Sequence, residues 1–181
     1  DWTIDDSSWD VAGLRSTGSK DVIVKNAFLP KHRVVEFKQL LEHKGPNPGI
    51  FKKSLYAAPY WVIFPLGITS AVVGMAEGLL RAFEDYQRDR VSIQGIVAKE
   101  DPFALYATAE AASDIRASRT SLLNGAYEAI KGAEKGHEFT LAERARLRRD
   151  QSRAAWRCAE AIQPLVAKAG GKGLMFANPI Q

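Results

Sequence analysis

The chain has 181 residues, of which 46% are apolar, and its 25 Lys and Arg against 21 Asp and Glu give a formal net charge of +4. That length suits one domain with a hydrophobic core and is short for two. So small a positive excess gives no reason to expect binding to nucleic acid. The single cysteine, Cys158, excludes an intrachain disulfide and favours a reducing, cytoplasmic setting. Pro65 and Gly67 interrupt the most apolar run, so we expect no membrane span.

The first part of the chain, residues 1–37, is strand-like. Short aromatic or aliphatic runs alternate there with turn-forming residues, and they occupy 1–4, 9–14 and 21–26. A few strands this short do not form a stable sheet by themselves. We therefore interpret 1–37 as the end of an incomplete β-domain, and the start at Asp1 within strand-like sequence as the mark of a fragment.

Residues 38–58 are predicted to form a linker, because Gly45-Pro46-Asn47-Pro48-Gly49 suits neither a helix nor a central strand. Three long helices should follow within 59–181. The first is expected from about 59 to 90, with a kink or a delayed start at Pro65.

The second helix should begin at Asp101-Pro102, an N-cap residue followed by a proline at the first helical position. Its apolar stripe recurs every three or four residues, at Phe103, Ala107, Ala111, Ile115, Ser118, Leu122, Ala126 and Ala129. The third helix should begin with a capping box at Thr140 and Glu143 and end before Gly170. Its expected apolar positions are Leu141, Ala145, Trp156, Ala159, Ile162 and Val166.

Short connections between these helices predict an up-down bundle of antiparallel neighbours. The fold class is therefore mainly α, with a β remnant before the bundle. Because three helices of this length leave a groove, we expect a fourth helix beyond Gln181, so that the bundle in 59–181 is incomplete.

Familiar catalytic and metal-binding motifs are absent from the sequence. His32, His43 and His137 are far apart in loops or at element ends, and we interpret them as surface residues. The sequence therefore predicts no metal site and assigns no catalytic acid or base. Arg149, Arg153 and Arg157 share one helix face, which we interpret as a solvated or subunit-facing stripe rather than an RNA-binding face, since no aromatic platform accompanies it.

The most informative loop lies between the strand-like runs. Thr17 and Ser19 offer hydroxyl groups, and Gly18 allows the backbone to approach a ligand closely. By itself such a turn is more often only a connection.

Residues 9–22, with the sequence WDVAGLRSTGSKDV, and the following Phe28-Leu29-Pro30 resemble the end of the middle β-barrel domain in the acyl-CoA dehydrogenase superfamily. The Thr-Gly-Ser loop is most similar to the flavin-dependent monooxygenase branch, the oxygenase components of two-component aromatic hydroxylases. The resemblance continues at Asp101-Pro102, Ala109-Glu110-Ala111, Arg148-Arg149-Asp150-Gln151 and Gly170-Gly171. It covers nearly the whole chain and only the C-terminal portion of such a protein.

The resemblance implies a site for reduced flavin, as FMN or FAD. Arg15, Thr17, Gly18 and Ser19 would face the flavin ring or its ribityl chain. Arg90 and Gly170-Gly171, from a neighbouring subunit, would lie near its phosphate end. The dehydrogenase branch has other residues at three places, where this chain has Ile93-Gln94-Gly95, Leu105 and Ala167. These departures favour weak, exchangeable binding of reduced flavin.

The activity implied by the resemblance is hydroxylation of an aromatic substrate. A separate flavin reductase would supply reduced flavin, which reacts with O₂ to a C4a-hydroperoxide, within a homotetramer built on the helices. Tyr56, Tyr60, Trp61 and Phe64 are the candidates for an aromatic substrate-pocket wall, and core or interface packing is an equal alternative for them.

Two other functions stay open. An acyl-CoA dehydrogenase would need a carboxylate base, and no isolated Glu in the sequence is distinctive. A non-catalytic helical interaction module would bind no flavin even within a complete protein.

Overall fold

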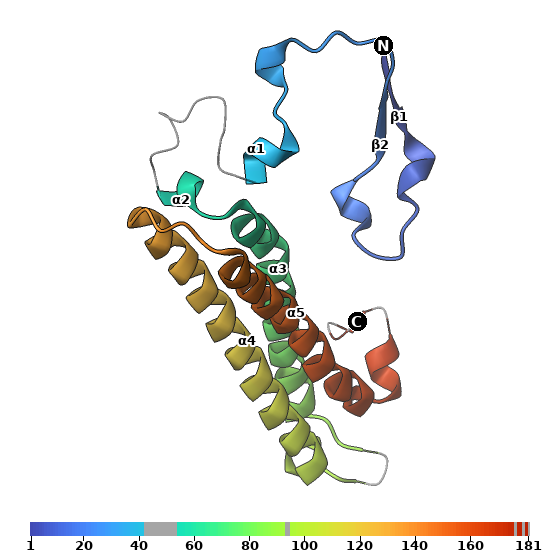
Figure 1. Cartoon of the computed structure of the whole chain (residues 1–181). Coiled ribbons are helices and arrows are strands. Elements are labelled where there is room, and N and C mark those ends of the chain that lie inside the picture. The colour runs from blue at the N-terminus through green and yellow to red at the C-terminus, as the bar shows by residue number, and fades with distance from the viewer. Residues whose placement is uncertain (42–53, 93–94, 176, 179, 181) are drawn as a thin grey trace. The chain divides into compact units, whose positions relative to one another are not determined.

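The computed structural model describes residues 1–41, 54–92, 95–175, 177–178 and 180 (Figure 1). The chain divides into two compact units, Asp1–Phe37 and Lys38–Gln181. Each unit is described by itself below.

The first unit contains a two-stranded antiparallel sheet. Strand β1, Trp2–Asp5, pairs with strand β2, Asp21–Val24, so that Trp2 lies opposite Val24. Nearly all strand side chains are exposed, and the sheet is not closed. The expectation that these residues do not form a self-sufficient sheet is met within this unit.

The strand predicted at 9–14 is wrong. The Asp5 carboxylate accepts hydrogen bonds from the backbone N–H and the hydroxyl of Ser7, and this capping starts a 3-10 turn at Asp6–Trp9. Leu14 then adopts a positive φ of 60°, which interrupts extended backbone. A further 3-10 turn, Lys31–Arg33, follows β2.

The second unit begins with two short helices, α1 at Phe37–Leu41 and α2 at Ser54–Ala57, both in or beside the segment predicted as a linker. The Gly-Pro-rich stretch 45–49 and His43 lie outside the described residues. Helix α2 packs against the second long helix of the bundle.

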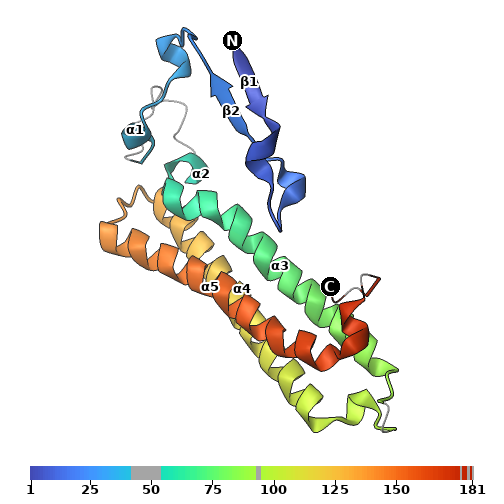
Figure 2. The ribbon, with the colours of Figure 1, turned by 90° about the vertical axis from the view of Figure 1, so that its right-hand side faces the viewer.

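The bundle consists of three long helices, α3 (Tyr60–Arg88), α4 (Pro102–Glu134) and α5 (Leu141–Ala169). Each packs against the other two, and consecutive helices run antiparallel (Figures 1 and 2). The main hydrophobic core lies where all three meet, around the fully buried Phe83 and Leu165. The predicted mainly α fold with a three-helix bundle is therefore confirmed.

Helix α3 is not delayed by its proline. The Pro59 carbonyl accepts hydrogen bonds from the backbone of Val62 (2.9 Å) and Ile63 (3.1 Å), and the helix continues through Pro65. By length and composition alone α3 is apolar enough to cross a membrane, which the sequence expectation missed. One face of this helix is buried in the bundle, where Val73 and Phe83 contribute to the core.

The predicted helix starts are confirmed. Asp101 Oδ1 accepts a 3.0 Å hydrogen bond from the backbone N–H of Phe103, directly before α4. At α5 the capping box is complete, because Thr140 Oγ1 accepts from Glu143 N (3.2 Å) and Glu143 Oε2 accepts from Thr140 N (2.8 Å). These three short-range bonds satisfy backbone groups that a helix end leaves free.

The predicted buried stripe holds for most of α4 and fails for α5. On α4 Phe103 is 71% exposed, and its neighbour Ala104 is buried instead. On α5 the predicted Leu141 and Trp156 are 75% and 67% exposed. The buried positions of α5 are Leu147, Gln151, Ala154, Cys158, Ala161, Leu165 and Ala169. Small side chains at most of these positions let three helices approach closely, which a tryptophan would prevent.

Candidate functional site

The loop between the two strands is held together by one carbonyl group. The carbonyl oxygen of Leu14 accepts hydrogen bonds from Thr17 N (3.0 Å), Thr17 Oγ1 (2.8 Å) and Trp9 Nε1 (3.2 Å). These three donors fix a 3-10 turn at Arg15–Thr17. The loop is therefore ordered by its own contacts, before any ligand is present.

The two predicted loop hydroxyls have different capacities. Thr17 Oγ1 donates its proton to Leu14, and it lies 3.1 Å from Ser19 Oγ. Because a hydroxyl has one proton, Ser19 is the donor in this pair. The Ser19 proton is the one that can turn toward a ligand, whereas the hydroxyl of Thr17 acts as its acceptor.

The neighbouring positions leave room for a ligand. Gly18 has a φ of 56°, and a Cβ placed on it would meet no atom within 4 Å. The Arg15 side chain turns back along the chain, donating from Nε to the carbonyl of Val11 at 3.0 Å and lying 3.5 Å from Asp10 Oδ1. An open, left-handed glycine beside a free hydroxyl suits close approach by a flat ring.

In the second unit, the structure brings Arg90 and Gly170 side by side, as the predicted site requires of these two residues. Arg90 Nη1 donates a 2.7 Å hydrogen bond to the carbonyl of Lys168, in the last turn of α5. Gly170 has a φ of 67°, and a Cβ there would lie 2.7 Å from Arg90 Nη2. Gly171 starts a 3-10 turn, Gly171–Leu174, and has open space around it.

Two further residues of α3, missed by the sequence analysis, bind the same helix end. Tyr86 donates from its hydroxyl to the carbonyl of Ala169 at 3.2 Å, and Gln87 Nε2 approaches the carbonyl of Lys168 at 3.5 Å. The Arg90 guanidinium also lies over the Tyr86 ring, 5.5 Å from its centroid. Together they satisfy carbonyl groups that a helix C-terminus leaves unpaired.

This cluster changes the interpretation of Arg90. One of its nitrogens is engaged by α5, so its first role is to join two helices. The remaining guanidinium donors stay available on a half-buried side chain. A positively charged group with free donors next to a glycine turn can bind a phosphate or carboxylate.

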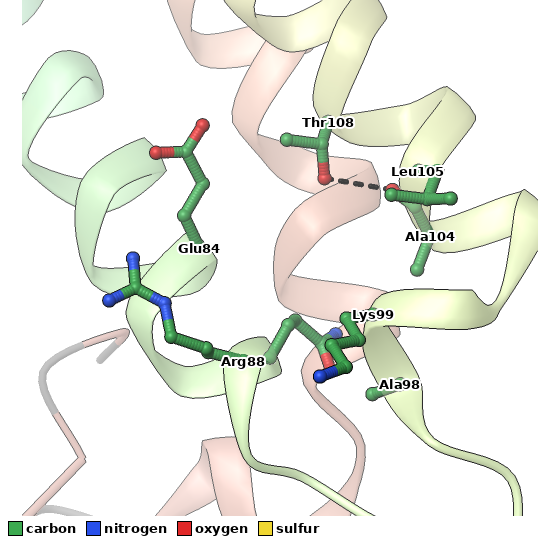
Figure 3. Close-up of a pocket in the computed structure, with 8 residues that line it drawn as sticks. Glu84, Arg88, Ala98, Lys99, Ala104, Leu105 and Thr108 are labelled. Atoms are coloured by element: carbon green, nitrogen blue, oxygen red, sulfur yellow. Dashed lines mark hydrogen bonds between the residues drawn. The ribbon is translucent and has the colours of Figure 1, made fainter.

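A cavity of about 300 Å³ lies beside this helix end, between the end of α3 and the start of α4 (Figure 3). Glu84 and Arg88 line it from α3, and Leu105 and Thr108 line it from α4. Gln87 also lines the cavity, and its side-chain oxygen is buried without a hydrogen-bond partner among the described residues. That oxygen can accept a hydrogen bond from water or from an N–H or O–H group of a ligand.

The predicted aromatic wall is a surface cluster. Tyr60 stacks on Phe64 with centroids 5.2 Å apart and meets Trp61 edge-on at 5.4 Å, all at the start of α3. Phe64 is 59% exposed, and Tyr56, in α2, is 56% exposed. Such rings offer a flat apolar surface to a ligand or to another protein surface.

Ionisable groups elsewhere do not assemble into a reactive site. Among the described residues, no group of three or more His, Cys, Asp and Glu could hold a metal ion. The arginine stripe of α5 is exposed and paired with carboxylates: Arg149 with Asp150, Arg153 with Glu160, and Arg157 with Asp114. His32 and His137 lie at exposed turns.

Residues 66–181 match the acyl-CoA dehydrogenase, C-terminal domain family, and the chain belongs to this family. The predicted resemblance to that superfamily is confirmed. Among curated proteins the chain is 39% identical over 181 residues to a pigment production hydroxylase from Rhodococcus erythropolis. It is 37% identical over 183 residues to the flavin-dependent monooxygenase, oxygenase subunit HsaA, from Rhodococcus jostii (strain RHA1).

A more distant relative is the FADH(2)-dependent resorcinol hydroxylase, oxygenase component, from Rhizobium sp. (strain MTP-10005), at 31% identity over 186 residues. The fold matches the crystal structure of 3-HSA hydroxylase from Rhodococcus sp. RHA1 with a TM-score of 0.89 at 37% identity. The match covers all of this chain and 47% of that structure. The curated relatives are covered to 46–48% of their lengths, so the chain spans about half of each.

Proposed function

We propose that this chain is the C-terminal portion of the oxygenase component of a two-component flavin-dependent monooxygenase, an enzyme that hydroxylates an aromatic substrate. The observation that carries the proposal is the 37% identity, across the whole chain, to an oxygenase subunit of that class. The pre-ordered loop around Ser19 supports it, because it lies in the segment that first resembled this branch.

Reduced flavin, as FMN or FAD, is the proposed cofactor, and when bound it supplies the activation of O₂. The residues present fit such a group. Ser19 has a proton that can turn toward a polar atom of the flavin ring, and the open backbone at Gly18 admits the ring. Thr17 and Arg15 hold the loop in shape.

The phosphate end of the flavin is assigned to Arg90 and the Gly170-Gly171 turn of a neighbouring subunit. The support is the contact between Arg90 and the Gly170 backbone, which places spare guanidinium donors beside a turn without side chains. Because one Arg90 nitrogen is occupied by Lys168, we expect a single, weak charge-assisted contact with phosphate. Weak binding suits a cofactor that arrives reduced from a separate reductase and leaves oxidised.

The aromatic substrate is assigned to the surface formed by Tyr56, Tyr60, Trp61 and Phe64. Stacked rings can hold a planar substrate and exclude water from the reacting oxygen. The relative that hydroxylates resorcinol acts on such a ring, which supports this substrate class.

We further propose that the complete protein is a cytoplasmic homotetramer assembled through its helices, with a flavin reductase as its second partner. Large exposed side chains on all three long helices support self-association, among them Met75 on α3, Tyr127 on α4 and Trp156 on α5. No specific observation favours a dehydrogenase or a non-catalytic module over the monooxygenase.

The Ser19 assignment is tested by reduced-flavin affinity, measured anaerobically on the full-length protein that carries this chain. Losing one hydrogen bond in Ser19→Ala should weaken binding by about threefold to tenfold. Ser16→Ala, an exposed serine of the same turn, is the matched control and should bind as the parent does. Equal affinities of the Ser19 variant and the parent would remove Ser19 from the site.

A further inference from the structure

The outer face of α5 carries an exposed tryptophan at the middle of the helix. Helix α5 runs from Leu141 to Ala169, and Trp156 is 67% exposed although it is the largest side chain of that helix. The buried residues of α5 lie on the opposite side of the helix, with Cys158 and Leu165 fully buried. A face with a central tryptophan that the described part of the bundle leaves exposed calls for a partner.

The residues around Trp156 form a continuous exposed seam. They recur every three or four positions, which places them along one line of a helix. The seam consists of Ala145, Arg149, Ser152, Trp156, Glu160, Gln163 and Ala167, all exposed.

This seam is symmetric about Trp156 in side-chain size and hydrogen-bonding chemistry. Ala145 and Ala167 lie eleven residues on either side of it, Arg149 and Gln163 seven residues, and Ser152 and Glu160 four residues. The outermost members are small, and each inner pair joins a hydrogen-bond donor to an acceptor. When two such helices run antiparallel, equally distant positions face each other.

We infer that α5 packs antiparallel against α5 of a second copy of this chain, around a two-fold axis at Trp156. This inference rests on the self-association proposed above and names the surface that carries it. A two-fold interface must be self-complementary, because each residue meets its symmetry counterpart. The α5 seam meets that requirement, and the partner is therefore the same chain.

The charges beside the seam supply the second observation. Arg153 and Glu160 form a two-pronged ion pair within one chain, with N–O distances of 3.1 and 2.8 Å. In the antiparallel pair, Arg153 of one copy and Glu160 of the other differ by one residue in height, about 1.5 Å along the helix. Both lie on the same side of the seam, so the pair can also form between copies.

The contacts expected at the axis are those that dominate protein interfaces. Tryptophan and arginine are the residue types most enriched among energetically important interface positions. The alanines at both ends of the seam let the two backbones approach, and the polar pairs surround the central rings. The interface is thus a tryptophan contact enclosed by four exchanged charges.

The test uses two charge variants of the full-length protein, Arg153→Glu and Glu160→Arg, studied by light scattering after size-exclusion chromatography. Neither variant retains the pair within one chain. In each variant alone, the charges that face each other across the axis have the same sign, and we expect the mass to fall to half that of the parent.

Mixing the two variants is the decisive step. The Glu160→Arg variant then places two guanidinium groups opposite the two carboxylates of the Arg153→Glu variant, and we expect the parental mass to return. A pair that acts only within one chain cannot produce this recovery. Arg81→Glu, at an exposed position of α3, is the control and should keep the parental mass.

Each outcome has a defined meaning. A monomeric parent overturns both this inference and the proposed assembly. Variants that keep the parental mass, or a mixture that does not recover it, overturn the α5 interface and leave assembly through other faces standing. Circular dichroism checks folding, and Trp156→Ser, which changes no charge, should also halve the mass.

Discussion

Arg90 joins the last residues of α3 to the C-terminus of α5, because its Nη1 donates a 2.7 Å hydrogen bond to the carbonyl oxygen of Lys168. The same guanidinium lies against Gly170, where any side chain would collide with it. One residue thus holds two helices together and offers its remaining donors beside a glycine turn.

Arg90→Ala should lower the free energy of unfolding by about 1 kcal/mol, the low end for a bond from a charged donor, because the side chain is half-exposed. Urea unfolding without flavin measures this effect. Arg88→Ala is the control, since Arg88 pairs with Asp85 in an exposed ion pair and should change stability by less than about 0.5 kcal/mol. If both variants unfold alike, Arg90 does not join the helices as described.

Gly170→Ala should destabilise the bundle by about 1–3 kcal/mol, because the position has a φ of 67° and ψ of −169°, a conformation that side chains other than glycine avoid. The added Cβ would also displace the Arg90 guanidinium from 2.7 Å. Gly171→Ala, with a permitted φ and open surroundings, is the neighbouring control and should cost less than about 0.5 kcal/mol. Thermal unfolding of the pair compares them directly, and equal melting temperatures would contradict the prediction.

Acid should weaken the cap of α5. The backbone N–H of Thr140, its hydroxyl and His137 together lower the pKa of Glu143 from 4.5 to about 2. A carboxylate whose pKa is lowered in the folded state contributes stability above its unfolded pKa and loses it as the pH falls. The contribution should therefore be complete above about pH 4.5 and disappear toward pH 2.

Melting temperatures of the parent and Glu143→Gln between pH 6 and pH 2 measure this effect. The gap between the two proteins should narrow as the pH falls through that window. Glu138→Gln, an exposed change in the same connection, supplies the control. A gap that stays constant across the window would show that the Glu143 charge does not stabilise the cap.

Local signals in the sequence predicted the helix starts well. The caps at Asp101 and Thr140 depend on residues at most three positions apart, so their chemistry is readable along the chain. The buried face of α5 was not readable in this way. Gln151 is buried because it donates a 2.6 Å hydrogen bond to the carbonyl of Val62 on α3, whereas the apolar Trp156 faces outward.

The candidate site divides in the same manner. Resemblance alone predicted that Arg90 and Gly170 belong to one site, and the structure brings them together. The parts played by Tyr86 and Gln87 were missed, because a side chain that binds the carbonyls of a distant helix end has no periodic signature. Leu14 was also missed, since a positive φ at a leucine depends on contacts from Trp9 and Thr17.

The central claim is tested most directly by hydroxylation coupled to a flavin reductase, in the full-length protein. Reduced flavin supplied by an NADH-dependent reductase, O₂ and a phenolic probe such as resorcinol should give a hydroxylated ring, with the new oxygen derived from ¹⁸O₂. Acyl-CoA thioesters should reduce no dye. Dye reduction by acyl-CoA, with no ¹⁸O incorporated into any phenol tested, would contradict the monooxygenase and favour the dehydrogenase.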